Sequence, residues 1–221
     1  MVSGFWLAQP PHWNPSHSPL SGWLGHAPFA SRLIEAIRPQ TIVELGTHTG
    51  YSFFAFCEAV KKLSLDTALY AIDTWVGDTH AGFYDEHVYE EVKWLRDEEY
   101  PDAHLLRGQF DEHVETFPDN SIEIIHIDGR HRYEDVEHDY TTWLPKLAPN
   151  GVILFHDVAV TEGTFGVHLL WEQLTKNHPT LTFPHGNGLG VLTPKGVPDS
   201  LTELLDPTNA TRIQALYSVM L

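Results

Sequence analysis

Two histidines and two aspartates stand where apolar, strand-like segments of the sequence end. Asp128 ends one such segment, His131 comes three residues later, and His156 and Asp157 end the next one. Carboxylate oxygens favour magnesium or calcium, and imidazole shifts the preference toward manganese, iron or zinc. Neutral imidazole is also a general base near pH 7. We therefore expect a metal set of Asp128, His156 and Asp157, and catalytic groups drawn from Asp128, His131 and His156.

A second candidate site is the turn that follows the first predicted strand, Thr41–Leu45. The turn reads Gly46-Thr47-His48-Thr49-Gly50 and leads into a predicted helix over Tyr51–Leu63. Glycine lets the backbone approach a ligand closely, and a helix N-terminus presents free amide groups. The Gly-x-x-x-Gly spacing is not that of a dinucleotide site, and there is no Walker lysine. The turn therefore suits a ligand without a pyrophosphate, such as one with a zwitterionic amino-acid moiety.

Polar and aromatic side chains also follow the second and third predicted strands. Asp73 ends the strand Ala68–Ile72, where a carboxylate can accept both hydroxyls of a ribose. Trp75, two residues on, is placed to stack on or wall an adenine. Gln109 follows the strand His104–Arg107, and its amide is placed to meet the adenine edge. These residues predict a nucleoside-containing ligand.

The scaffold that must position these residues is an alternation of strands and helices. The predicted strands are Thr41–Leu45, Ala68–Ile72, His104–Arg107, Ile122–Ile127 and Val152–Phe155, closed by an antiparallel pair, Leu181–Pro184 and Gly190–Thr193. The predicted helices are Pro28–Ile37, Tyr51–Leu63, Tyr84–Asp97, Asp111–Phe117, Tyr133–Leu147 and Phe165–Asn177. Such an alternation predicts a doubly wound, Rossmann-like α/β fold with helices on both faces of a mostly parallel seven-stranded sheet whose last strand is antiparallel. Ligands of such sheets bind beyond the carboxyl ends of the strands.

The chain divides into three predicted parts. Residues 1–26 are rich in Pro, Ser, Gly and Trp and form an irregular arm that lies over the domain. Residues 27–196 form the α/β domain. Residues 197–221 form a helical tail, with helices expected at Leu201–Leu205 and Ala210–Met220. The apolar end of this tail packs on its own domain, forms a dimer contact or belongs to a larger chain, and the sequence does not choose among these.

Composition excludes several classes of protein. The 221 residues carry a formal net charge of −17, which argues against a nucleic-acid partner, because such partners need clustered Lys and Arg. The single cysteine, Cys57, excludes an intramolecular disulfide. No apolar run approaches the roughly 20 residues of a membrane span, and no signal peptide is evident. We expect a cytoplasmic protein with a small-molecule ligand.

Several motifs together resemble a known enzyme family. Glu44-Leu45-Gly46-Thr47-His48-Thr49-Gly50, then Asp73, Asp128-Gly129 and the run 147–152 resemble the class I S-adenosylmethionine-dependent methyltransferases. The run 127–136, with Asp139, Trp143 and Phe155-His156-Asp157, resembles a bacterial subgroup described as methyltransferase-24-like or cephalosporin-hydroxylase-like. Residues 73–84 resemble methyltransferase modules found beside bacterial glycosyltransferases. The resemblance covers roughly residues 40–195.

The resemblance implies a cofactor and a reaction. S-adenosylmethionine would be bound by residues of the first turn and of the following strand ends: Glu44, Gly46, Thr47, Gly50, Ser52, Asp73, Trp75, Gln109 and Asp128. A divalent metal (Mg, Mn or Fe) would be held by Asp128 and Asp157, with His156 at a position that is often acidic in relatives. The reaction would be O-methylation of a sugar, a glycan or another small hydroxylated acceptor. Asn150 replaces a family glycine, and Asn tolerates the positive φ of that turn.

Other functions remain open at this point. A metal-dependent oxygenase would use His131, His156 and Asp157 as a facial set around iron. A nicotinamide oxidoreductase is disfavoured because the dinucleotide glycine spacing is missing. A non-catalytic module that binds S-adenosylmethionine within a glycan-assembly system would not need Asp128, His131 and Asp157.

Overall fold

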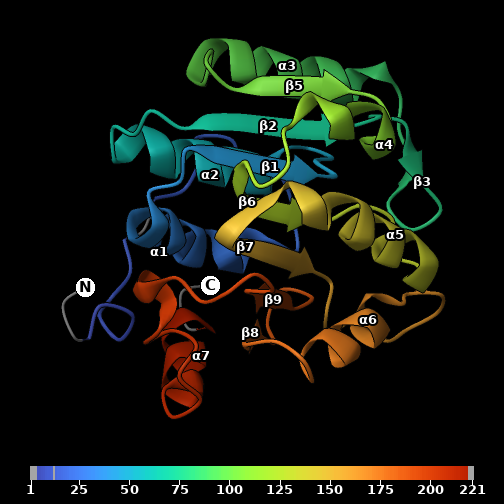
Figure 1. The fold of residues 1–221 in the computed structure, drawn as a ribbon. Helices are drawn as coiled ribbons and strands as arrows, with labels where there is room; N and C mark the ends of the chain where they lie inside the picture. The colour runs from blue at the N-terminus through green and yellow to red at the C-terminus, as the bar shows by residue number, and fades with distance from the viewer. Residues whose placement is uncertain (1–3, 12, 219–221) are drawn as a thin grey trace.

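The computed structural model describes residues 4–11 and 13–218, and its centre is one seven-stranded sheet (Figure 1). The sheet order is β5-β2-β1-β6-β7-β9-β8. Its parallel strands β5, β2, β1, β6 and β7 are His104–Arg107, Ala68–Asp73, Thr41–Leu45, Ile122–Ile127 and Leu147–His156. Strand β9 (Leu189–Leu192) is antiparallel to both β7 and β8 (Thr180–Phe183). The predicted fold class is confirmed.

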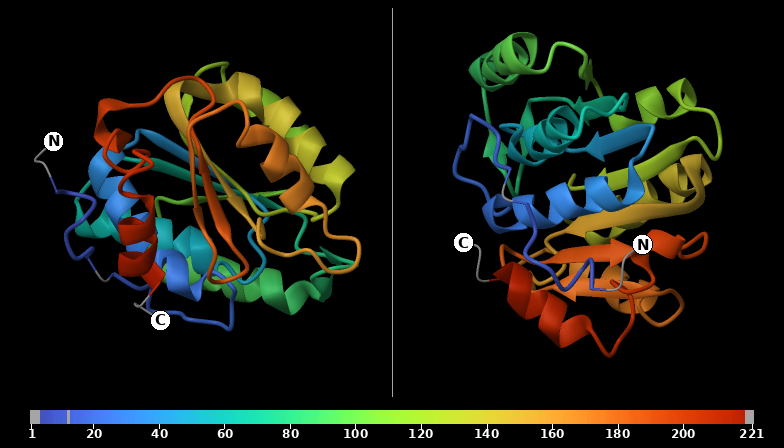
Figure 2. Two further views of the ribbon diagram at one scale, coloured as in Figure 1. Left: turned by 90° about the horizontal axis from the view of Figure 1, so that it is seen from below. Right: turned by 90° about the vertical axis from the view of Figure 1, so that its left-hand side faces the viewer.

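Helices cover both faces of the sheet, as Figure 2 shows. One face carries α1 (Ala27–Ile37), α2 (Tyr51–Lys62) and α3 (Glu86–Glu99), and the other carries α4 (Phe110–His113), α5 (Tyr133–Trp143) and α6 (Val167–Leu174). Successive strand side chains point to opposite faces. Ile42 and Ile124 therefore join one core, whereas Val43 and Ile125 join the other. Because the sheet is buried on both sides, its central strands are mostly apolar, and Glu44 of β1 and His126 of β6 are buried polar exceptions.

Element boundaries differ from the prediction where local chemistry ends a helix. The Asp85 side chain accepts a hydrogen bond from the amide of His87 at 3.0 Å, so α3 starts at Glu86 rather than Tyr84. Helix α5 ends at Trp143, because a 3-10 turn, η3, over Leu144–Lys146 contains Pro145. The helix predicted at 111–117 is divided between α4 and the 3-10 turn η2 (Val114–Thr116). The helices predicted at 165–177 and 201–205 are shorter and are reduced to α6 and the 3-10 turn η4 (Asp199–Leu201).

A two-stranded hairpin, β3 (Gly77–Asp78) with β4 (Gly82–Phe83), was not predicted. It stands at the edge of the molecule where the parallel strands end (Figure 1). The Asp78 carboxylate accepts hydrogen bonds from the amides of His80 and Ala81 at 2.7 and 2.8 Å, which closes the turn. The strands have only two residues each, which is too short for a periodic pattern to signal them.

The arm and the tail pack together against α1. The backbone amides of Gly4 and Trp6 donate to the Glu203 carboxylate at 2.6 and 2.9 Å, and the buried Trp6 indole donates to the carbonyl of Ser200. After the 3-10 turn η1 (Leu24–His26) the arm runs directly into α1. Tyr217 of α7 (Ala210–Ser218) packs against Phe29 and Phe183. The predicted end of this helix, residues 219 and 220, lies outside the described residues. Among the helices that the structure describes, none is both long and apolar enough to cross a bilayer.

Candidate active site

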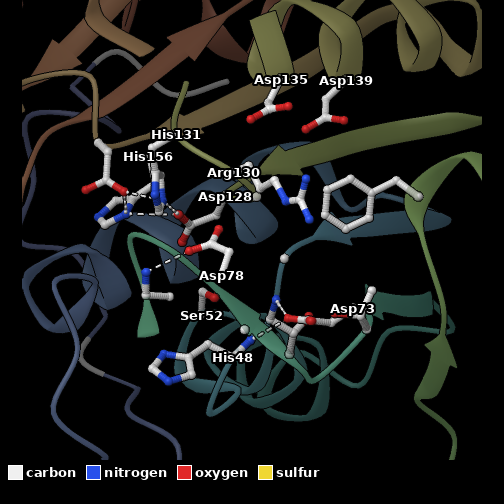
Figure 3. Close-up of a pocket in the computed structure, with 18 of the residues that line it drawn as sticks. His48, Ser52, Asp73, Asp78, Asp128, Arg130, His131, Asp135, Asp139 and His156 are labelled. Atoms are coloured by element: carbon white, nitrogen blue, oxygen red, sulfur yellow. Dashed lines mark hydrogen bonds and ion pairs between the residues drawn. The ribbon is translucent and has the colours of Figure 1, made fainter. Parts of the chain in front are cut away.

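A cavity of about 690 Å³ opens beyond the carboxyl ends of β1, β2, β6 and β7 (Figure 3). Most of the glycine turn lines it, together with Asp73, the loop from Asp128 to His131, and the pair His156-Asp157. The remaining wall comes from the arm, the β3–β4 hairpin and the starts of α4 and α5. The volume lies within the range of roughly 300–1,000 Å³ that is typical of small-molecule sites.

The two glycines of the turn have different roles. Gly46 lines the cavity with φ of +90°, and a Cβ there would lie 2.1 Å from the carbonyl oxygen of Asp128. Only glycine therefore lets β1 turn so close to the end of β6. Gly50 caps α2 with φ of +86° and does not itself line the cavity, although its neighbours do. The Thr47 hydroxyl is buried in the cavity wall and has no hydrogen-bond partner among the described residues, so it is free for a ligand.

Asp73 lies at the predicted strand end, but its carboxylate already has protein partners. One oxygen accepts from the amides of Thr47 and His48 at 2.8 and 2.9 Å, and the other accepts from the amide of Trp75 at 2.7 Å. A carboxylate has about four acceptor sites, so it retains room for a ribose hydroxyl. The structure thus gives Asp73 a second task, which is to tie the glycine turn to the end of β2.

Three predicted cofactor residues lie elsewhere than expected. Trp75 is buried and is not among the residues that line the cavity; its indole donates to the carbonyl of His48 and its ring packs on Tyr89. Gln109 lines the cavity, but its side chain is engaged in a capping box with Glu112. Glu44 is fully buried behind the cavity wall.

Glu44 belongs to what we call the buried triad: Trp23, His126 and Glu44. The Trp23 indole nitrogen donates to His126 Nε2 at 3.1 Å, and His126 Nδ1 lies 2.8 Å from Glu44 Oε2. An indole can only donate. His126 Nε2 must therefore accept the indole hydrogen bond. The ring proton of His126 then lies on Nδ1, which donates a hydrogen bond to Glu44 Oε2. Ser52, which does line the cavity, lies close enough to Glu44 to lower the pKa of that carboxyl, so the triad reaches from the arm to the back of the cavity wall.

The predicted chemistry residues do converge, and we call them the strand-end cluster: Asp128, His131, His156 and Asp157. His131 Nε2 lies 2.9 Å from Asp157 Oδ2 and 3.8 Å from Asp128 Oδ1. His156 Nδ1 lies 3.5 and 3.3 Å from the same two oxygens. His156 Nε2 donates to the carbonyl of Gly186 at 2.9 Å, which fixes the ring. Figure 3 shows both imidazoles meeting Asp128 at one side of the cavity.

Mutual ion pairing sets the charges of the strand-end cluster. Burial alone opposes every charge there, but the ion pairs outweigh it. They raise the pKa of His131 to about 10 and the pKa of His156 well above its usual value. The same pairs hold the pKa of Asp128 well below the usual carboxyl range and lower the pKa of Asp157. At neutral pH the cluster thus holds two imidazolium and two carboxylate groups, and its net charge is zero.

Backbone and ring contacts hold the cluster in place. Asp157 has a φ of +59°, an unfavourable value for a residue with a side chain. The ring of His131 stacks on Phe165 with centroids 4.8 Å apart and lies 5.5 Å from the ring of His80. His80 comes from the β3–β4 hairpin, so the hairpin reaches the cluster from across the cavity.

Some lining residues carried no sequence signal. Leu20, Ser21 and Gly22 of the arm line the cavity, and so does Asp139 in the middle of α5. The arm lacks periodicity, and Asp139 looks like one acid among many on a helix. Tyr84 also lines the cavity, and its ring stacks on His48.

Comparisons with known proteins agree with this geometry. A family described as a methyltransferase domain matches residues 43–158, more than half of the chain. The uncharacterized protein y4gI of Sinorhizobium fredii is 46 % identical over 186 residues, which cover 84 % of this chain. Those residues are only 20 % of that protein, so the chain spans about a fifth of the length of this relative.

Solved structures share the fold at low sequence identity. The O-methyltransferase TomG from Streptomyces achromogenes, in complex with SAM, has a TM-score of 0.58 and 17 % identity over 80 % of this chain and 82 % of that one. An O-methyltransferase from Bacillus cereus in complex with SAH has a TM-score of 0.58 and 13 % identity over 81 % and 84 %. A methyltransferase from Geobacter sulfurreducens has a TM-score of 0.55 and 17 % identity over 76 % and 77 %. The chain belongs to the methyltransferase domain family and has the fold of the class I S-adenosylmethionine-dependent methyltransferases.

Proposed function

We propose that the chain transfers the methyl group of S-adenosylmethionine to a hydroxyl of a small acceptor, with sugars and glycans as the class to test first. One observation carries the proposal: the strand-end cluster and the glycine turn line the same cavity. A donor on the turn would therefore present its methyl group to an acceptor at the cluster. Much of the catalysis would then be the positioning of the two reactants.

The cofactor would enter by its amino-acid end. Its carboxylate would meet the start of α2, where no side chain caps the helix, and the free hydroxyl of Thr47. Asp73 would share its remaining acceptor capacity with the ribose. Gly46 would let the backbone pass beneath the sulfonium group. This assignment keeps Gly46, Thr47, Ser52 and Asp73 as contacts and leaves Glu44 and Gly50 as residues that shape the turn.

The acceptor hydroxyl must lose its proton when the new O–CH3 bond forms. Asp128 has the more exposed carboxylate of the cluster, with 21 % of its side chain accessible, so it would accept the hydrogen bond of the hydroxyl. His131 or His156 would take the proton only after losing its own, because both pKa values are raised. The free imidazole expected from the sequence is thus not the resting state at pH 7.

A divalent cation fits the strand-end cluster. Asp128, His131 and Asp157 offer ligand atoms that all lie within 4.8 Å of one another. His156 is anchored through its far nitrogen on the carbonyl of Gly186, as ligating histidines usually are. A dication would also replace the two imidazolium protons without changing the net charge. When bound, Mg, Mn or Fe would supply positive charge that lowers the pKa of the acceptor hydroxyl.

Polar and aromatic groups support a hydroxyl-rich acceptor. Asp78 and Tyr84 line the cavity, and the rings of His80, His131 and Phe165 form a stack beside it. Carboxylates accept hydrogen bonds from sugar hydroxyls, and flat rings pack on sugar faces. The oxygenase alternative is not proposed, because the chain belongs to a methyltransferase family.

The test is calorimetric titration of S-adenosylmethionine into the metal-stripped protein, repeated with magnesium, manganese or iron. We expect binding by the wild type and a loss of at least about tenfold in Asp73→Ala, with Asp102→Ala, an exposed acid outside the cavity, as the matched control. Transfer of labelled methyl to a panel of sugars and glycans then tests the acceptor class. Absence of binding by folded wild type would overturn the proposal, and binding without transfer in cells or extracts would favour a non-catalytic module.

A further inference from the structure

Asp139 is a buried acid with no assigned role. It lies on the inner face of α5, only 7 % exposed, and yet it lines the cavity. Its carboxylate accepts no hydrogen bond and forms no ion pair with any residue that the structure describes. Burial raises the pKa of Asp139 to about 7, and the nearby Asp135 and Asp111 add to this while His138 opposes it. The carboxylate lines the cavity, so a hydrogen-bond donor can reach it from there.

Asp139, Gly129 and the ring of Phe110 lie together in one part of the cavity wall. A Cβ placed on Gly129 would lie 2.6 Å from a ring carbon of Phe110 and 3.3 Å from Asp139 Oδ2. Because position 129 is a glycine, the ring of Phe110 and the carboxylate of Asp139 can both lie close to its backbone. Figure 3 shows Asp139 and Asp135 projecting from α5 into the space beside Arg130. A flat heteroaromatic ring that carries an amino group would offer a face to the ring of Phe110 and a donor to the carboxylate of Asp139.

The sequence predicts that Gln109 meets the edge of the adenine, but in the structure its side chain makes another contact. The Gln109 side chain accepts a hydrogen bond from the backbone N–H of Glu112. In return the Glu112 carboxylate accepts one from the backbone N–H of Gln109 at 2.7 Å. This capping box starts α4. Releasing the Gln109 side chain for a ligand would give up one half of this capping box.

We propose that Asp139 recognises the 6-amino group of the cofactor's adenine, which packs beside the ring of Phe110. The inference rests on the proposed function, in which the amino-acid end of the cofactor binds at the glycine turn and its methyl group faces the strand-end cluster. The part of the cavity between the starts of α4 and α5 then remains for the base. The Asp139 carboxylate accepts a hydrogen bond from the 6-amino group and repels the oxygen of a 6-oxo base. A site built to hydrogen-bond one such group discriminates strongly against a ligand that lacks it.

The experiment compares two nucleosides by calorimetry: S-adenosylhomocysteine and its 6-oxo counterpart, S-inosylhomocysteine. The wild type should bind the 6-amino compound about 100-fold more tightly. Asp139→Asn should lose about 10- to 100-fold in affinity for the 6-amino compound and gain affinity for the 6-oxo compound, because the asparagine amide donates to the 6-oxygen. The wild-type preference should therefore collapse or invert.

Matched variants separate recognition from a structural role. Glu134→Gln removes an exposed charge from the first turn of α5, outside the cavity, and should keep the wild-type preference. Asp139→Asn should be at least as stable as the wild type, because it removes an unpaired buried acid; Asp139→Ala, read for the same collapse of preference, serves if the first variant does not fold. Equal weakening of both nucleosides in the Asp139 variants, or loss of preference in Gln109→Ala instead, would overturn the inference alone. Failure of the wild type to bind either nucleoside would overturn the proposed function together with it.

Discussion

The strand-end cluster and the buried triad use the same chemical groups in opposite ways. Each pairs histidine with carboxylate at the ends or middle of neighbouring strands, β6 with β7 and β1 with β6. In the triad, every hydrogen bond runs in one direction, from Trp23 through His126 to Glu44, and the side chains of the His–Glu pair are fully buried. In the cluster, each imidazole faces two carboxylates, and Asp128 stays accessible from the cavity. The triad, whose hydrogen bonds are fixed in direction and closed to solvent, supports the fold. The cluster, whose groups share partners and remain accessible from the cavity, can act on a ligand.

The largest expected effect is on methyl transfer. Asp128→Ala should lower the rate by about 10³-fold, since it removes the group that meets the acceptor hydroxyl. S-adenosylmethionine binding should change by less than about tenfold, because the cofactor's amino-acid and ribose contacts remain. Labelled methyl transfer and calorimetry measure the two quantities, with Asp102→Ala as control. If Asp128→Ala loses S-adenosylmethionine binding as fully as methyl transfer, Asp128 acts chiefly on the cofactor. The proposed placement of the acceptor, rather than the cofactor, at Asp128 would then be wrong.

The next effect concerns stability and belongs to the triad. Glu44→Ala should lower the free energy of unfolding by about 3 kcal/mol, because it leaves His126 Nδ1–H buried without an acceptor and opens a cavity. Glu44→Gln keeps an acceptor and should cost less than about 1 kcal/mol. Urea unfolding at pH 7 measures both losses. Asp128→Ala, measured beside them, should lower the free energy of unfolding by about 1 kcal/mol. Equal costs for Glu44→Ala and Asp128→Ala would erase the contrast between the two regions.

The carboxyl groups of the two regions should also respond to pH with opposite signs, because the pKa values of Asp128 and Asp157 are lowered whereas the pKa of Glu44 is raised. The raised pKa of His131, about 10, contributes stability that is fully present below the unfolded value near 6.5 and is lost as pH rises through 10. The lowered pKa values of Asp128 and Asp157 contribute stability that is present above the unfolded value near 4 and is lost as pH falls. The pKa of Glu44 is raised, chiefly by burial, so its contribution falls as pH rises above about 4.5.

Urea unfolding from pH 4 to pH 10 separates these contributions. His131→Ala should remove roughly 2 kcal/mol of the decline between pH 6.5 and 10, and Glu44→Gln should remove a decline that begins near pH 4.5. A wild-type profile that is flat between pH 6.5 and 10 would contradict the ion pairing of the cluster. Magnesium or manganese should flatten the alkaline decline, since a bound cation displaces the imidazolium protons.

The smallest effect tests the link between the arm and the site. Trp23→Phe keeps the buried ring but removes the indole donor, and it should cost about 1 kcal/mol of stability. S-adenosylmethionine affinity should fall by less than about threefold, because His126 and Glu44 keep their own hydrogen bond. Trp6→Phe, which removes the indole bond to Ser200 far from the cavity, is the matched control. A larger loss of affinity in Trp23→Phe would mean that the triad positions the cofactor actively.

Much of this protein follows from local sequence patterns. Apolar runs of strand length that alternate with helical periodicity fixed the order of elements, and the strand-end rule placed Asp73, Asp128 and His156 beside one cavity. The glycine at position 46 and the positive φ of Asn150, observed at +59°, were also predicted from backbone requirements. These features depend on neighbours within a few residues, so the chain encodes them locally.

Only the tertiary structure decided which polar side chains face the cavity. Asp73, Glu44 and Gln109 all looked like ligand contacts, yet hydrogen bonds from other elements engage them partly or wholly. Trp23 reaches His126 across 103 positions of the chain, and no local pattern carries that distance. Asp139 became a candidate because no residue that the structure describes donates a hydrogen bond to its carboxylate. A sequence states which donors and acceptors exist, whereas their availability is settled when distant segments pack and satisfy one another.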